Sequence, residues 1–148
     1  MAMNYVNFEN ARIIFRNFKG EKSKFNTSGA REFSVVINDK DIADALIAEG
    51  WNVKFLAPKE PEEDGAYILK VAVSYMYNPP KIFMVNGDTV TPIDEDTVGE
   101  LDYADIAYCD LTITPYHWEL NGKSGIKAYL KTMYVNVIPD TFAAKYNK

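Results

Sequence analysis

The chain has 148 residues, of which 47% are hydrophobic and 14% aromatic, and it carries a formal net charge of −5. This length and apolar content predict one folded domain over residues 1–148 and argue against a disordered chain, with 139–148 as a short helix or frayed end. The single cysteine excludes an internal disulfide, and the first ten residues do not resemble a signal peptide. We therefore expect a soluble, cytoplasmic protein that does not enter a membrane.

The charges are unevenly distributed along the chain. Residues 60–110 carry two basic and twelve acidic side chains, whereas residues 1–31 carry six basic and two acidic ones, and 111–148 carry five and two. A protein this acidic is a poor candidate for coating duplex DNA by electrostatics alone. It can still form a local basic groove if its two positive ends converge in space.

The first elements predict a long-looped hairpin and then a helix. Residues 10–18 and 31–37 alternate as strands on either side of a polar loop that holds three lysines and two glycines. A helix is expected from an N-cap at Asn38 or Asp39 to Gly50. The alternation places the side chains of the first strand on two faces, with Ile13 and Phe15 on one face and Arg12, Ile14, Arg16 and Phe18 on the other.

The middle of the chain predicts further strands at 51–56, 66–77, 81–85, 89–93 and 106–115, with an acidic, irregular segment at 94–105 that holds at most one helical turn. About eight strands with one helix and no βαβ alternation predict a mainly β fold. We expect a small Greek-key barrel of the oligonucleotide-binding (OB) type, with one central α-helix and extended hairpins.

The last hairpin is the clearest local signal. Asn121-Gly122 favours a type I′ turn, because both central residues of that turn take φ > 0. After the turn, strict alternation predicts a core face and an outward face. The two faces are Ile126, Ala128, Leu130, Thr132 and Tyr134 inward, and Lys127, Tyr129, Lys131 and Met133 outward.

Catalytic chemistry has little support in the sequence. The only histidine, His117, lies between two aromatic residues and is expected to pack or to form hydrogen bonds, and Cys109 alternates with core residues. No metal-ligand spacing, nucleophile elbow or phosphate-binding glycine loop is present in the sequence. We expect no enzyme, no cofactor and no metal.

Binding of a single-stranded nucleic acid has more support. In an OB barrel the ligand crosses the central strands between two flanking loops, and here both hairpins carry cations. Surface lysines can equally serve solubility, and Tyr129 can simply cover a sheet edge. The candidate contacts are Arg12, Arg16, Lys22, Lys24, Phe25, Lys123, Lys127, Tyr129 and Lys131.

The order of elements resembles the OB-fold single-stranded DNA-binding proteins of tailed bacteriophages. The resemblance runs from about residue 10 to residue 137 and depends most on PYHW followed by NGKSGIKAYLKTMYV. It implies a non-catalytic, sequence-tolerant protein that covers single-stranded DNA during phage replication and recombination in the host cytoplasm. Such a protein often forms a homodimer and contacts replication or recombination proteins. Among the candidate contacts, the resemblance favours Lys127, Tyr129 and Lys131, and it adds Trp118 as a further one.

One feature departs from this group, whose members commonly end in an acidic tail. Here the chain ends in TFAAKYNK, and its acids lie in 60–64 and 94–110. The alternative hypothesis, motivated by the net charge of −10 over residues 60–110, is a non-catalytic interaction or assembly protein that uses an acidic surface at 94–110.

Overall fold

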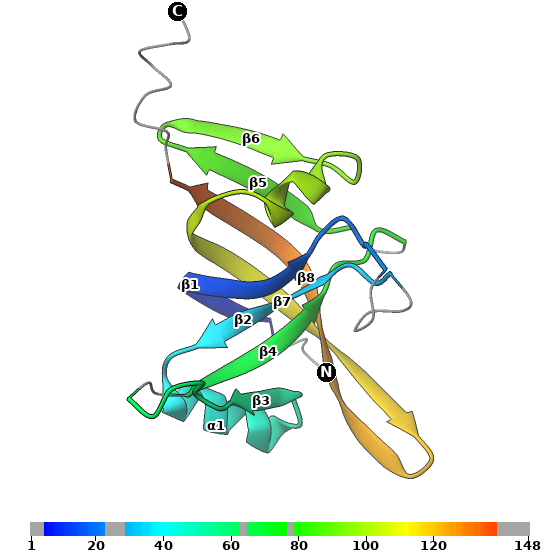
Figure 1. The fold of residues 1–148 in the computed structure, drawn as a ribbon. Helices are drawn as coiled ribbons and strands as arrows, with labels where there is room; N and C mark the ends of the chain where they lie inside the picture. Colours follow the sequence, from blue (N-terminus) through cyan, green and yellow to red (C-terminus); the bar gives the residue numbers. More distant parts are fainter. Residues whose placement is uncertain (1–4, 23–28, 63–64, 77–78, 139–148) are drawn as a thin grey trace, which may run out of the picture.

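The computed structural model describes residues 5–22, 29–62, 65–76 and 79–138, which form eight strands, one α-helix and one 3-10 helix (Figure 1). The elements in chain order are β1 (Val6–Asn17), β2 (Glu32–Ile37), α1 (Lys40–Glu49), β3 (Val53–Leu56), β4 (Ala66–Ala72), β5 (Lys81–Asn86), β6 (Thr89–Ile93), η1 (Val98–Asp102), β7 (Ile106–Leu120) and β8 (Lys123–Val137).

Five of these strands close into a barrel. Neighbouring strands follow the order β4-β2-β1-β7-β8, and a parallel pairing of β4 with β8, at Val71 opposite Ala128, completes the ring. A five-stranded barrel with this parallel closure is the OB type, so the predicted fold class is confirmed. Closure removes most free sheet edges, which stabilises the barrel and prevents edge-to-edge association.

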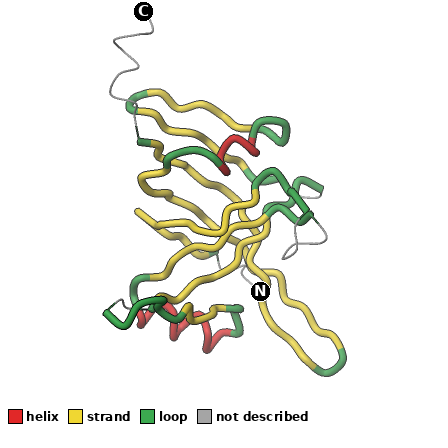
Figure 2. Tube along the Cα trace, in the orientation of Figure 1, coloured by secondary structure: helices red, strands yellow, loops and turns green. Residues whose placement is uncertain are grey.

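The long strand β8 organises the sheet. One of its edges pairs with β7 along the whole length, from Ile106 opposite Val137 to Leu120 opposite Lys123. Its other edge meets Trp51 through a bridge at Ile126, then β4, and then β5 over residues 132–136. The β5–β6 hairpin thereby extends the sheet at one end of the barrel, while the β7–β8 hairpin projects past the other end (Figures 1 and 2).

Alternating apolar side chains from all five barrel strands fill the interior. The β2 residues predicted to face inward, Phe33, Val35 and Ile37, are all buried, and Phe18 stacks on Phe33 with ring centroids 5.2 Å apart. Burying a side chain of this size contributes roughly 1.5–3 kcal/mol. The other side chains of this kind with almost no exposure are Leu69, Val71, Ile82, Val98, Leu101, Cys109, Ile113, Met133 and Val135.

Local signals set the ends of α1 and the turn of the last hairpin as predicted. The side chain of Asp39 accepts a hydrogen bond from the N–H of Asp41, and Gly50 ends the helix at φ 105°. Asn121 and Gly122 have φ values of 52° and 79°, as a type I′ turn requires. Val98–Asp102 forms the single helical turn allowed in the acidic segment.

The first strand differs from its prediction because it contains two irregularities. It begins at Val6, and register shifts fall next to Asn10 and Phe15, which both adopt positive φ. A bulge adds one residue to one strand and reverses the alternation beyond it. Phe15, predicted to share a face with the buried Ile13, is therefore 63% exposed, whereas Phe18, predicted on the opposite face, is fully buried.

A bulge also corrects the predicted faces of β8. Thr132 lies opposite Thr112 and Leu130 opposite Ile113, so Lys131 is the extra residue. Beyond it, Met133 turns into the core and Tyr134 turns out to solvent, the reverse of strict alternation. Ile126, Ala128 and Leu130 are buried, as expected.

The remaining differences are changes of length. The strand expected over 66–77 ends at Ala72, and β7 continues to Leu120 as one arm of the last hairpin. Trp51 joins the sheet only through its bridge to Ile126. The candidate residues Lys24 and Phe25, and the tail 139–148, lie outside the described residues.

Candidate nucleic-acid interface

A groove of about 520 Å³ lies where β4 and β8 meet, between the end of the β1–β2 loop (residues 18–31) and the β7–β8 hairpin. This is the position at which OB barrels bind oligonucleotides, on the face of the second and third barrel strands between two hairpin loops. The lining combines aromatic and cationic side chains: Trp51, Trp118, Arg31, Lys70 and Lys127.

The two tryptophans have different roles in this groove. Trp51 is buried, and its indole Nε1–H donates to Glu49 Oε2 at 2.9 Å, which makes it part of the floor. Trp118 is 40% exposed and lies against Gly125, its partner across the hairpin. A Cβ added at Gly125 would lie 2.9 Å from Trp118 Cζ2. The glycine therefore allows the indole ring to lie against the strand while part of the side chain remains exposed.

Cationic and aromatic side chains continue along the outer face of β8 from this groove. The Lys127 ammonium lies 5.1 Å from the centroid of the Tyr129 ring, and Tyr116 meets the same ring edge-on at 5.9 Å. The ladder explains this cluster, because Tyr116 is the β7 partner of Lys127. Lys127 forms no ion pair among the described residues, so its charge is available to a phosphate.

Acidic partners balance the other two groove cations. Lys70 pairs with Glu32 at 3.3 Å on the neighbouring strand, and Arg31 lies 3.8 Å from Glu95. Arg31 also donates to the carbonyl oxygen of Phe18 at 2.8 Å. These two cations therefore bind the protein's own acids.

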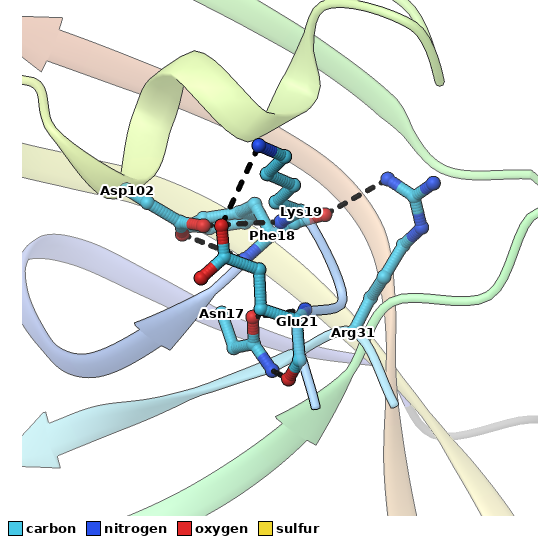
Figure 3. Close-up of polar contacts among 6 residues, drawn as sticks. All are labelled: Asn17, Phe18, Lys19, Glu21, Arg31 and Asp102. Carbon is cyan, nitrogen blue, oxygen red and sulfur yellow. Dashed lines mark hydrogen bonds and ion pairs between the residues drawn. The ribbon is translucent and has the colours of Figure 1, made fainter. Parts of the chain in front are cut away.

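A network of hydrogen bonds holds the start of the β1–β2 loop in place (Figure 3). The Asp102 carboxylate at the end of η1 accepts from the backbone N–H of Phe18 at 2.7 Å and of Lys19 at 3.1 Å. Asn17 and Glu21 exchange two further hydrogen bonds through the Asn17 amide, at 2.9 and 3.0 Å. Part of the acidic segment thus anchors a basic loop within the same chain.

The structure brings some of the predicted residues together and separates others. Trp118 and Lys127 line the groove, Tyr129 lies beside it, and Lys123 is exposed at the hairpin tip. Lys22 is exposed on the β1–β2 loop. Lys131 lies on the bulge with its Nζ 3.8 Å from the Tyr5 ring centroid.

Arg12 and Arg16 line a different hollow, of about 460 Å³, together with Phe15 and Tyr108. Arg16 Nη1 donates to the carbonyl oxygens of Leu101 and Ala104, both at 2.7 Å, so this arginine connects β1 to η1 and to the segment that follows it. The sequence could not separate these arginines from the groove, because the separation depends on how β1 curves around the barrel.

Sequence reasoning missed Trp51, Arg31, Lys70 and Glu32 as groove residues. Lys70 does alternate with buried Leu69 and Val71, which indicates an outward position. Its location beside Lys127, however, depends on the parallel β4–β8 pairing, which no local pattern predicts.

The described residues offer binding chemistry more than catalytic chemistry. Burial raises the pKa of the Cys109 thiol to about 12, so it is not a nucleophile near neutral pH. His117 is exposed on the projecting hairpin. Within the described part of the chain, no three His, Cys, Asp or Glu side chains gather as metal ligands, and no helix has the length and apolar content to span a membrane.

An OB-type barrel with exposed aromatic and cationic side chains in this groove defines a single-stranded nucleic-acid-binding type of protein. The whole chain, residues 1–148, matches the family described as "Putative phage ssDNA-binding domain". The protein therefore belongs to this family of phage single-stranded DNA-binding domains, which is a non-enzymatic kind of protein.

Solved structures of similar fold include the single-stranded DNA-binding protein from bacteriophage Enc34, with a TM-score of 0.60 and 13% identity over 93% of this chain and 83% of that one. The same phage protein in complex with single-stranded DNA gives a TM-score of 0.58 and 12% identity over 93% and 89% of the two chains. At 12–13% sequence identity, these comparisons show a similar fold only. No curated protein sequence matches the chain.

Proposed function

We propose that the protein binds single-stranded DNA in the groove between the β1–β2 loop and the β7–β8 hairpin, without marked sequence preference. The observation that carries this proposal is the half-exposed Trp118 ring on Gly125, in one groove with Lys70 and Lys127. Bases stack on the indole ring, because every base has a π face, and each stacked base contributes roughly 1–3 kcal/mol.

Phosphate groups are bound by the cations around the ring. Lys127 makes the first contact because it has no acidic partner among the described residues, and Lys70 joins by exchanging Glu32 for a phosphate. The acidic remainder of the chain confines the DNA to this face, since a net charge of −5 repels phosphate elsewhere. The family assignment and the Enc34 complex with single-stranded DNA support this proposal.

The biological role we propose is coverage of single-stranded DNA during phage DNA replication and recombination. Replication or recombination proteins would be partners in this role, and a homodimer would place two grooves on one strand. The acidic 94–110 surface remains the alternative interface for a protein partner. The Asp102 and Glu95 contacts give part of that segment a role inside the chain, which makes this alternative the weaker one.

Fluorescence anisotropy with labelled single-stranded oligonucleotides of different sequence tests the proposal. We expect Trp118→Ala to weaken binding to every sequence by about fivefold or more, while Leu120→Ala, an exposed apolar change on the same hairpin, leaves binding unchanged. Equal affinities of wild type and Trp118→Ala would contradict the groove as the site.

A further inference from the structure

A second aromatic platform lies on the outer face of the sheet, beyond the groove. Phe83 on β5 and Tyr134 on β8 are partners across a parallel ladder, and their rings stack with centroids 5.0 Å apart and an interplanar angle of 16°. Tyr134 is 41% exposed. A stacked ring pair that is open to solvent can extend its stack with a base.

The bulge at Lys131 puts this pair on the outside. Without the extra residue, Tyr134 would share the inward face of Leu130 and fill the core, which is what strict alternation predicts. With it, Met133 takes the core position and Tyr134 faces solvent. Bulges cost ladder hydrogen bonds and commonly re-aim a side chain for function.

Cations flank the platform. Lys81 begins β5 two residues before Phe83, hence on the same face, and lies opposite Thr132, next to the bulge residue Lys131. Both lysines are exposed, and neither forms an ion pair within the described residues. The one acid on this face of the neighbouring strand is Asp110, whose Oδ1 accepts the N–H of Asn10 at 2.9 Å.

The platform is continuous with the groove along the outer face of β8. At about 3.3 Å per strand residue, Tyr134 lies roughly 16 Å along β8 from Tyr129. Lys131 lies on this path, and Lys127 at its start lines the groove itself. Alternating aromatic rings and cations along one strand have the chemistry of an extended single strand, in which bases and phosphates recur together.

We propose that the Phe83–Tyr134 pair, with Lys81 and Lys131, is a second base-stacking platform that lengthens the single-stranded DNA site beyond the groove. This inference rests on the proposed function, because the strand must leave the groove to reach the platform. A short oligonucleotide fills the groove alone, and a longer one also occupies the platform. The affinity should therefore rise with oligonucleotide length until both stretches are covered.

Binding in the groove alone can be distinguished from binding that also reaches the platform with oligothymidylates of about 5 and about 16 nucleotides, which bracket the usual site sizes of an OB fold. We expect Tyr134→Thr, a change that keeps strand propensity, to weaken binding of the longer oligonucleotide by about fivefold or more and to leave the shorter one unchanged. Lys81→Gln should lower the salt dependence of the longer oligonucleotide alone, with a change in slope of about 0.7.

Phe55→Thr is the matched control, because Phe55 and Tyr67 form another cross-strand aromatic pair, at the β3 edge of the sheet. It should affect neither oligonucleotide. An equal loss for both lengths in Tyr134→Thr would mean that the pair only holds the sheet together, and no loss for either would mean that DNA does not reach it. Both results contradict the platform as a binding site but do not contradict the proposal that DNA binds in the groove. Failure of the wild type to bind either length would contradict the proposed function itself.

Photocrosslinking supplies a readout that does not depend on a variant's folding. A single 5-iododeoxyuridine is placed at different positions along the longer oligonucleotide. Some nucleotide positions should crosslink to Trp118, and the positions that crosslink to Phe83 or Tyr134 should all lie on one side of them. Crosslinks confined to Trp118 at every position would overturn the platform.

Discussion

The indole of Trp118 rests on Gly125 so closely that a Cβ at that position would lie 2.9 Å from Cζ2 and 3.1 Å from Nε1. The two residues are partners across the β7–β8 hairpin. The φ of Gly125 is not in the left-handed region, so the backbone conformation does not require a glycine here. The close approach of the Trp118 ring does.

Gly125→Ala should displace the Trp118 ring without unfolding the protein, because the crowded atoms belong to a side chain that can move. We expect single-stranded DNA affinity to fall by about fivefold, one stacked base being worth roughly 1–3 kcal/mol, with little change in Tm. Anisotropy and thermal melting measure the two effects. Ser124→Ala, the neighbouring change without a clash, is the control, and unaltered affinity in Gly125→Ala would show that the ring position is unimportant.

Asp102→Asn tests whether the acidic segment positions the β1–β2 loop. The amide group replaces one acceptor with a donor that faces a backbone N–H, which costs about 1–3 kcal/mol of stability and loosens Phe18 and Lys19. We expect weaker DNA binding, although the change removes a negative charge close to a basic loop.

Glu100→Gln is the control for that experiment, because it removes the same charge from an exposed position on η1. Simple electrostatics predicts slightly tighter binding for both variants. If Asp102→Asn also binds more tightly, Asp102 acts through its charge and does not position the loop.

Tyr129→Ala should weaken DNA binding by roughly 1–3 kcal/mol and leave the fold intact, because the ring lies on the outer face beside Lys127 and Tyr116. Tyr129→Phe keeps the aromatic face and should bind almost as wild type does. Circular dichroism and anisotropy on the same samples check both statements. Loss of the folded state in Tyr129→Ala would place this residue among those that hold the barrel together.

Cys109 should resist alkylation in the native protein. It is fully buried, and burial raises its pKa to about 12, so at pH 8 both access and thiolate are lacking. In the unfolded chain the thiol ionises near its ordinary value of 9.0, and hence the native state loses stability as the pH rises from 9 toward 12. Iodoacetamide labelling followed by mass spectrometry, with and without urea, tests the first point, and fast native labelling would contradict it.

The sequence predicted those parts of the fold that depend on local chemistry. Asn121-Gly122 requires a particular turn, Asp39 and Gly50 begin and end a helix, and the alternating apolar residues of β2 that were predicted to face inward are buried. These features depend on residues within a few positions of one another, so their patterns can be read directly.

The features that the sequence did not predict depend on contacts between distant segments. The bulge at Lys131 reversed the faces of Met133 and Tyr134, and the irregularities of β1 exposed Phe15. These irregularities accompany the curling of a sheet into a closed barrel, which leaves no local signature in the sequence. Only some of the groove residues were predicted, for the same reason. Trp51 and Lys70 reach the groove because their segments pair with β8, which lies far from them in the sequence.

The most direct test of the central claim is the affinity for a single-stranded oligonucleotide measured over a series of salt concentrations, for wild type and Lys127→Gln. We predict that log K falls linearly with log salt concentration, because bound phosphates release counterions, and that Lys127→Gln reduces the slope by about 0.7. Lys54→Gln, on the edge strand β3, should leave the slope unchanged. Absence of binding at low salt, or an affinity indifferent to salt, would contradict a groove that holds the phosphate backbone of single-stranded DNA.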